Sequence, residues 1–360
     1  MAEYPKFLYD LRYPAPLGAR QTRLHTVDVV LPRAPDKQAD KRRIWLIYIH
    51  GGAWRNPHQT SHGFQPAIRQ FLKAKNKDTL DSIAAFASPN YRLSHNAEAP
   101  TPDDSATWAR HPDHLNDVLS ALEYLHQTYD VGSTRGYILV GGSSGATLTY
   151  QVGRAFGAPF ETSSSVNIPA PLALIGLGGI YNLALLIQTR RDIPLYREFV
   201  AGAFGNDEQA WNRASPAKNI PGAGGQIGLF GECTALAVLV HADGDEVVDA
   251  DQKAQMEKVL IGWVGPQFTL TREEQSRSII WRASGEVKSV RTLVSKVFTG
   301  SHEELWEAPK QMVECITEAI HIVGPKDSSM SGSTRRPYCP CPYRKFKVSK
   351  FGTKAGVRAV

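Results

Sequence analysis

Between about residues 20 and 325, continuous apolar runs alternate with segments of helical periodicity. A continuous apolar run bounded by turn residues is typical of a strand buried on both faces, and strands that alternate with helices form a mostly parallel sheet. The expected fold class is therefore α/β, with a mostly parallel sheet, helices on both faces and a small helical cap. The candidate strands are Leu24–Leu31, Ile44–His50, Ile83–Ser88, Tyr137–Gly141, Leu172–Leu177, Ala235–His241 and Leu293–Phe298.

Helical periodicity is clearest between these strands. Pro112–Tyr129 carries apolar residues three and four positions apart, and its proline suits a first helical turn. Gln252–Trp263 shows a similar pattern. The segment Tyr181–Phe204 is apolar but interrupted, so we expect a helical cap over the sheet at about 181–215.

The expected domain organisation has one large unit. Residues 1–20 form an N-terminal extension, residues 21–325 form the α/β domain, and residues 326–360 form a tail. Residues 266–292 are charged and poorly patterned, which predicts an excursion before the last strand. The tail is rich in Gly, Ser, Pro and basic residues, so we expect it to be disordered.

The charge of the chain is concentrated in the tail. The net charge is +6, but residues 326–360 alone carry nine Lys or Arg and one acid, Asp327, so the remainder is slightly acidic. The domain therefore gives no reason to expect nucleic acid as a partner. No apolar run is long enough for a membrane span, and no secretory leader is evident at the N-terminus. The four cysteines have no framework spacing, so we expect a reduced, cytoplasmic protein.

A candidate nucleophile follows one of the predicted buried strands. The segment Gly141-Gly142-Ser143-Ser144-Gly145 matches the pattern G-x-S-x-G, and helix-compatible residues come after it. In a strand–turn–helix context this pattern is typical of a nucleophile elbow, with the central serine in a strained conformation at the end of the sheet. Ser143 is the preferred nucleophile. Ser144 is its rival, but no glycine stands two residues after it.

A second loop is expected to supply an oxyanion hole. The strand that begins at Ile44 ends in His50–Trp54, where two glycines allow the backbone to approach a substrate closely. The expected donors are the backbone N–H groups of Gly52 and Ala53, together with the N–H of Ser144 after the nucleophile. Trp54 is either a core residue or an aromatic wall for the substrate.

The acid and the base are expected after the last two predicted strands. The order Ser, acid, His along the chain requires a carboxylate after Ala235–His241, and Asp245 is preferred over Asp243. His302 follows the final strand in a loop with small residues before it, from which an imidazole can reach the serine and act as general base.

A metal site is a weaker interpretation of the histidines. His111 and His114 stand near Asp113 and Asp117 at a helix start, but no third ligand has suitable spacing. We therefore expect no metal and no cofactor.

With both motifs placed, residues 20–325 resemble the fungal type of kynurenine formamidase within the α/β-hydrolase superfamily. The resemblance depends on His50, Gly51 and Trp54 in an H-G-G-x-W motif, on the elbow, and on the segment Asn90–Leu93, which is similar to an N/D-Y-R-L motif of this family and of related esterases. It matches Asp245 and His302 to the acid and base of the family. Where this chain has Gly142, formamidases often carry a larger residue such as His.

The resemblance implies hydrolysis of N-formyl-L-kynurenine to L-kynurenine and formate in tryptophan degradation. Two alternatives stay open from the sequence. One is a general carboxylesterase of the hormone-sensitive-lipase-like type that acts on short acyl esters with the same residues. The other is a non-enzymatic scaffold of the same fold whose basic tail binds acidic surfaces or nucleic acid. The sequence does not determine the oligomeric state, and a homodimer stays open.

Overall fold

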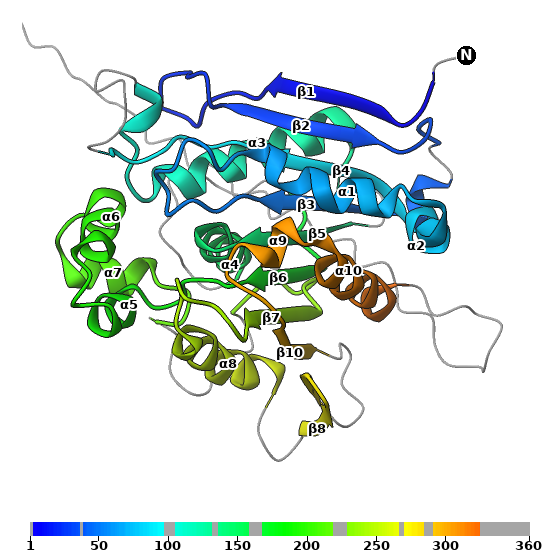
Figure 1. The fold of residues 1–360 in the computed structure, drawn as a ribbon. Helices are drawn as coiled ribbons and strands as arrows, with labels where there is room; N and C mark the ends of the chain where they lie inside the picture. The colour runs from blue at the N-terminus through cyan, green and yellow to red at the C-terminus, as the bar shows by residue number, and fades with distance from the viewer. Residues whose placement is uncertain are drawn as a thin grey trace, which may run out of the picture.

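The architecture is a single mixed sheet between two layers of helices (Figure 1). A computed structural model describes residues 3–36, 39–96, 105–131, 136–157, 168–218, 229–265, 270–283 and 291–324. In these ranges the sheet has ten strands in the order β1-β2-β4-β3-β5-β6-β7-β10-β9-β8. The strands are β1 (Lys6–Arg12), β2 (Thr26–Leu31), β3 (Ile44–Ile49), β4 (Ile83–Pro89), β5 (Tyr137–Gly142), β6 (Ala173–Leu177), β7 (Leu236–Ala242), β8 (Leu270–Gln275), β9 (Ser278–Ala283) and β10 (Thr292–Phe298).

The helices fill most of the connections between strands. The α-helices are α1 (Gln65–Phe71), α2 (Lys77–Asp81), α3 (Asp113–Tyr129), α4 (Ser144–Ala155), α5 (Leu183–Thr189), α6 (Pro194–Phe204), α7 (Glu208–Ala214), α8 (Ala250–Val264), α9 (Glu304–Glu307) and α10 (Pro309–Val323). Short 3₁₀ helices cover Asp40–Arg42, Ser61–Phe64, Ala74–Asn76 and Ser105–Thr107.

The central strands are apolar along their whole length because both of their faces are buried. In β3, Ile47 packs into one hydrophobic core while its neighbour Leu46 packs into the other. In β5, Leu139 and Val140 divide between the two cores in the same way. Successive side chains of a strand point to opposite faces, so continuous apolar runs indicate burial on both sides. The predicted α/β class with a mostly parallel sheet is confirmed.

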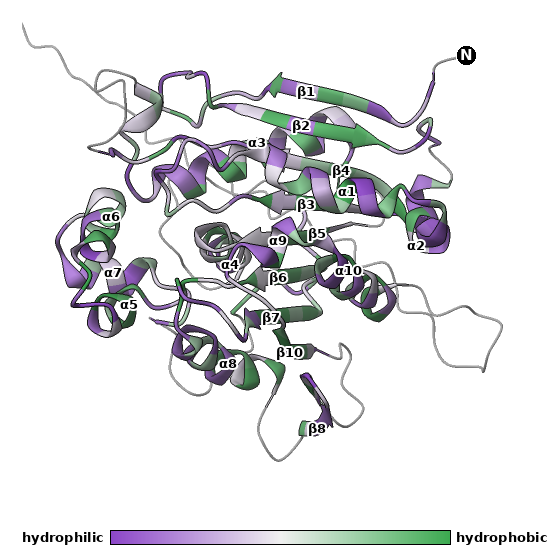
Figure 2. Cartoon of the chain, viewed as in Figure 1, coloured by the Kyte–Doolittle hydropathy of each residue, from purple (hydrophilic) through white to green (hydrophobic). Residues whose placement is uncertain are grey.

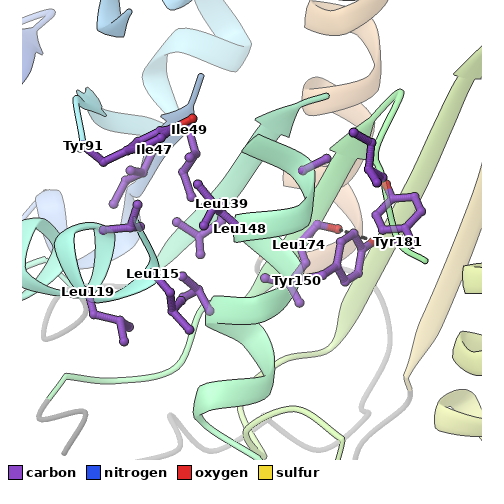
Figure 3. Close-up of a cluster of buried hydrophobic side chains, with 14 of the residues drawn as sticks. Ile47, Ile49, Tyr91, Leu115, Leu119, Leu139, Leu148, Tyr150, Leu174 and Tyr181 are labelled. Carbon is purple, nitrogen blue, oxygen red and sulfur yellow. Dashed lines mark hydrogen bonds between the residues drawn. The ribbon is translucent and has the colours of Figure 1, made fainter. Parts of the chain in front are cut away.

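Each core is closed by its own helices. Leu115 and Leu119 of α3 and Leu148 of α4 pack against Ile47 and Leu139 of the sheet, as Figure 3 shows. The opposite core is covered by α1 and α10, which lie together on one face in Figure 1. Burying an apolar side chain of this size contributes about 1.5–3 kcal/mol each, so both faces of the sheet are strongly specified.

Three short helices occupy the stretch where a cap was expected. Helices α5, α6 and α7 pack on one another and lie together beside the sheet in Figure 1. They follow β6 and precede β7, so they branch from the middle of the sheet. Phe199 and Phe204 of α6 reach back to Trp54, which attaches the cap to the loop after β3.

Both outer parts of the sheet come from segments with weak patterning. The expected N-terminal extension contains β1, which pairs antiparallel with β2. The expected excursion at 266–292 contains β8 and β9, an antiparallel hairpin on β10. Five of the six residues of β8 are exposed, and Figure 2 shows this strand as largely hydrophilic, in contrast to the more central β7. Within the described ranges, no helix has the length and apolarity needed to span a membrane. The tail at 326–360 lies outside the described residues.

The parallel strands bring six chain exits to one edge of the sheet. Strands β4, β3, β5, β6, β7 and β10 run parallel to one another, so their carboxyl ends point the same way. The loops that leave these ends include residues 50–54, 143, 178, 243–248 and 299–302. In open α/β sheets this edge is where ligands bind.

Candidate active site

Ser143 is the corner residue between β5 and α4. Its backbone has φ 52° and ψ −123°, a conformation that side-chain-bearing residues rarely adopt. The N–H of Ser143 donates to the carbonyl of Leu177 at 2.8 Å, which ties the corner to the end of β6. Such strain costs about 1–3 kcal/mol and is typical of functional sites. Ser144, the rival nucleophile, is fully buried in the first turn of α4.

The two outer glycines of the motif are required by close packing. A side chain at Gly141 would collide with the carbonyl of Gly145 in α4, and a side chain at Gly145 would collide with the carbonyls of Ile49 and His50 at the end of β3. The obstacles are backbone atoms and cannot move aside locally. The sharp turn therefore exists only with glycine at both positions.

His302 and Asp245 form a short hydrogen bond beside the elbow. The Nδ1–H of His302 donates to Oδ2 of Asp245 at 2.7 Å. The other carboxylate oxygen of Asp245 accepts the N–H groups of Val247 at 3.0 Å and Val248 at 2.8 Å. Both carboxylate oxygens are held, so the orientation of the carboxylate is fixed and Nε2 is the ring nitrogen available to a serine proton.

The environment of Asp245 keeps it charged. Burial by itself raises the pKa of this carboxyl, but the hydrogen bond and charge of His302 and the N–H of Val248 outweigh burial and lower the pKa below its ordinary value. Asp243 has different partners. It accepts the N–H of Gly300 at 3.1 Å and pairs with Arg277 at 2.6 Å. The structure therefore brings Asp245, and not Asp243, to His302.

Two contacts place the ring of His302 next to the elbow. The ring lies over Gly178, where a Cβ would stand 2.9 Å from Cε1. Gly178 directly follows Leu177, the residue that holds the Ser143 N–H. On its other side, the His302 ring meets the Trp306 ring edge-on, with centroids 5.1 Å apart. Trp306 in turn lies against Gly142. The imidazole is thus confined between two neighbours of the elbow.

The loop after β3 approaches Ser143 from the opposite side. A Cβ on Gly51 would stand 3.0 Å from the Cβ of Ser143. The chain then continues through left-handed conformations, with φ 97° at Gly52, 48° at Ala53 and 60° at Trp54. Among the described residues, the N–H groups of Gly52 and Ala53 donate to no protein acceptor, and the carbonyl of Gly52 accepts the N–H of Arg55 at 2.9 Å. Free N–H groups beside a serine are the geometry that an oxyanion hole requires.

Trp54 does not form an exposed aromatic wall. Its side chain is 0% exposed and packs against Phe199 and Phe204 of the cap. A ring with no accessible surface supports the loop and cannot line an open substrate surface. His50 is also buried, which lowers its pKa to about 4, and its Nδ1–H donates to the Gly51 carbonyl at 2.9 Å. His50 is therefore neutral near pH 7.

Tyr91 supports this loop and was not selected from the sequence as a site residue. Its hydroxyl donates to the carbonyls of His50 at 3.0 Å and Gly51 at 3.2 Å, and its ring stacks on the His50 ring with centroids 4.3 Å apart. The neighbouring residues of the N-Y-R-L segment bind elsewhere, since Arg92 pairs with the buried Asp117 at 2.8 Å. The sequence feature that could have identified Tyr91 is its place in the N-Y-R-L segment.

Replacing Tyr91 with Phe is expected to lower kcat about tenfold while KM changes less than about threefold, because the loop loses its anchor without losing a substrate contact. Steady-state kinetics measure this split. Tyr150→Phe is a matched control, since its buried hydroxyl donates to Val238 at 3.0 Å away from the loop. Equal kinetic effects of the two changes would mean that Tyr91 has only a structural role.

His114 and Asp117, two of the residues near the start of α3, are engaged by other side chains. Nε2 of His114 is hydrogen-bonded to Ser94 at 2.9 Å, and Asp117 is engaged by Arg92. Burial lowers the pKa of His114 to about 3. Over the described part of the chain, no group of three or more His, Cys, Asp or Glu is arranged to hold a metal ion.

The space beside Gly142 is filled by two aromatic residues. A Cβ there would stand 2.8 Å from the hydroxyl oxygen of Tyr48 and 2.9 Å from Cε3 of Trp306. The larger residue that formamidases often carry at this position has no room here, because side chains from β3 and α9 occupy it.

Replacing Gly142 with Ala is expected to destabilise the fold by about 1–3 kcal/mol through overpacking. It should also lower kcat, because a displaced Trp306 moves the ring of His302. Thermal unfolding and steady-state kinetics measure the two effects. Adding Tyr48→Phe removes one colliding atom and should restore part of the stability. A Gly142→Ala protein as stable as the parent would contradict the packing argument.

The sheet and the serine corner are those of an α/β-hydrolase. Esterase B of Lactobacillus Rhamnosis superposes with a TM-score of 0.56 at 13% identity, covering 88% of this chain and 84% of the esterase. Carboxyl esterase 2 of Tuber melanosporum gives a TM-score of 0.54 at 14% identity, covering 89% of each chain. Likeness at this identity defines the fold alone, which is the α/β-hydrolase fold.

Sequence relatives define the family more narrowly. Residues 27–260 match the family model BD-FAE. A kynurenine formamidase-like hydrolase of Fusarium equiseti is 32% identical over 86% of this chain and 93% of its own length. A kynurenine formamidase of Aspergillus versicolor is 34% identical over 80% of this chain and 92% of its own length. The chain therefore belongs to the BD-FAE family of α/β-hydrolases, among its kynurenine formamidase-like members.

Proposed function

We propose that this protein hydrolyses N-formyl-L-kynurenine to L-kynurenine and formate with Ser143 as nucleophile, His302 as general base and Asp245 as its partner. The observation that carries the proposal is the 2.7 Å hydrogen bond from His302 to Asp245 beside a strained serine corner. The formamidase relatives support the choice of substrate.

In the first half of the reaction, Ser143 attacks the formyl carbon while His302 Nε2 takes its proton. The negative charge on the formyl oxygen is stabilised by the backbone N–H groups of Gly52, Ala53 and Ser144, each worth about 10²–10³ in rate. Asp245 stabilises the imidazolium that forms. His302 then protonates the aryl amine, the C–N bond breaks, and L-kynurenine leaves with a formyl ester on the serine.

In the second half, water replaces the amine. His302 removes a proton from the water, which attacks the formyl-serine carbonyl and forms a second tetrahedral intermediate at the same N–H groups. The proton then returns to the Ser143 oxygen, and formate is released. No cofactor or metal takes part in either half, because attack, charge stabilisation and both proton transfers are assigned to named groups of the chain.

The test compares two substrates with the purified protein. We expect kcat/KM for N-formyl-L-kynurenine to exceed that for p-nitrophenyl acetate by at least about tenfold, because only formyl-kynurenine has an aromatic amino-acid part whose binding energy can lower the barrier, and the positioned acid of His302 offsets its poorer leaving group. Kynurenine formation and nitrophenolate release are both followed by absorbance. A much higher value on the ester would favour a general carboxylesterase.

A further inference from the structure

An ion pair joins the candidate oxyanion loop to the cap. Nη1 of Arg55, in the loop after β3, lies 2.6 Å from Oε1 of Glu198 on α6. The Arg55 side chain is 11% exposed and that of Glu198 is 55% exposed. A nearly buried guanidinium therefore meets a carboxylate that is still open to solvent.

Both partners are fixed to the loop that approaches Ser143. The backbone N–H of Arg55 donates to the Gly52 carbonyl at 2.9 Å, and Arg55 is only two residues beyond Ala53, so their Cα atoms are at most about 7.6 Å apart. Phe199, the neighbour of Glu198, packs on Trp54 with centroids 6.3 Å apart. Both residues of the pair are thus anchored to the loop whose N–H groups would receive the formyl oxygen.

The pair retains much unused hydrogen-bonding capacity. A guanidinium has five N–H donors, and among the described residues the Arg55 side chain uses only Nη1. The other ion pair between cap and body is different. Arg190 engages Asp249 through Nε at 3.2 Å and Nη2 at 2.8 Å, and Thr189 also binds that carboxylate. The carboxylate of the Arg190 pair is thus bound by two side chains, whereas the Arg55 guanidinium has N–H donors left for a ligand.

We propose that Arg55 and Glu198 form the subsite for the α-amino-acid end of the substrate, an inference that rests on the proposed function. Arg55 takes the substrate carboxylate and Glu198 takes the ammonium group. A zwitterion needs one partner of each sign, and an arginine fork suits a carboxylate. The amino-acid end of formyl-kynurenine stands several bonds from its formyl carbon. A subsite formed by Arg55, beyond the oxyanion donors on the same loop, and by Glu198 of α6 is therefore separated from the formyl site, as the substrate requires.

The experiment uses two formanilides that differ only at the amino-acid end. One is N-formyl-L-kynurenine, and the other is 2′-formamidoacetophenone, which keeps the formyl amide and the aryl ketone. For Arg55→Gln we expect KM for formyl-kynurenine to rise about 10- to 100-fold with kcat within about threefold. Both constants for the acetophenone should stay within about twofold. Glu198→Gln should raise KM for formyl-kynurenine by about 3- to 10-fold. This effect is smaller because the Glu198 carboxylate is more exposed to solvent.

Two further variants separate binding from cap attachment. Arg190→Gln breaks the other cap-to-body pair, and it should change kcat/KM for the two substrates by the same factor. Arg55→Lys keeps the charge but loses the fork, so it should restore part of the affinity for formyl-kynurenine. The melting temperature of each variant shows whether the fold is retained.

The outcomes distinguish the subsite from the proposed function. Suppose that the parent protein hydrolyses formyl-kynurenine. If Arg55→Gln then lowers activity equally on both substrates, or leaves activity on both unchanged, the subsite assignment is wrong and the proposed function stands. If the parent protein hydrolyses neither formanilide, the proposed function fails, and the subsite fails with it. A selective rise in KM for formyl-kynurenine supports both.

Discussion

Replacing Ser143 with Ala is expected to lower formyl-kynurenine turnover by about 10⁵- to 10⁶-fold. The covalent step needs a nucleophile at the corner, and the remaining N–H groups alone provide only a small part of the catalysis. Ser143 is 8% exposed and its backbone conformation is imposed by the neighbouring elements, so alanine should fit without rearrangement. Kinetics measure turnover, and circular dichroism with thermal unfolding confirms the fold.

The neighbouring Ser144 offers a matched control. It is fully buried at the start of α4, and its proposed contribution is a backbone N–H that alanine also has. Ser144→Ala should therefore keep activity within about tenfold of the parent. If Ser144→Ala abolishes turnover and Ser143→Ala does not, the assignment of the nucleophile is wrong.

Replacing Asp245 with Asn is expected to lower kcat by about 10⁴-fold. An asparagine at this position can present its NH₂ group to His302, which would then hold the proton on Nε2 and be unable to accept one from Ser143. The side chain keeps its size, so the loop at Val247 and Val248 should keep its shape. The low pKa of Asp245 means that the parent carboxylate stays charged at neutral and mildly acidic pH.

Asp243 provides the comparison, because it was the rival for the same role. Its side chain is 43% exposed and pairs with Arg277, so Asp243→Asn should change kcat by less than about threefold. Comparable losses from the two substitutions would mean that the 243–246 loop rearranges when substrate binds. Equal losses would also remove the reason to prefer Asp245.

The central part of the fold was predictable because its pattern is local. All seven predicted strands are present as β2, β3, β4, β5, β6, β7 and β10, with ends that differ by a few residues. The predicted helix Pro112–Tyr129 is α3, and Gln252–Trp263 lies within α8. A strand buried on both faces must be apolar throughout, and a helix with one buried face must repeat every three to four residues. Each requirement appears in the sequence itself.

The edge strands were not predicted, for an equally physical reason. In β1 five of the seven residues are exposed, and in β8 five of the six residues are exposed. These strands are stabilised by backbone pairing with β2 and β9, which depends on distant residues and places little demand on their own side chains. Local sequence therefore carries only a weak indication of them.

For the site, residue spacing alone indicated the class of chemistry and a short set of candidate residues. Glycine spacing and strand exits selected the corner at Ser143 and the histidine at 302, because those features depend on nearby residues. The tertiary structure was needed to show which carboxylate meets the imidazole, that Trp54 packs against the cap, that Tyr91 holds the loop beside the serine, and that Arg55 forms an ion pair with the cap. Such contacts join residues far apart in the chain, and the three-dimensional pairing of strands, not their sequence pattern, brings them within a few ångströms.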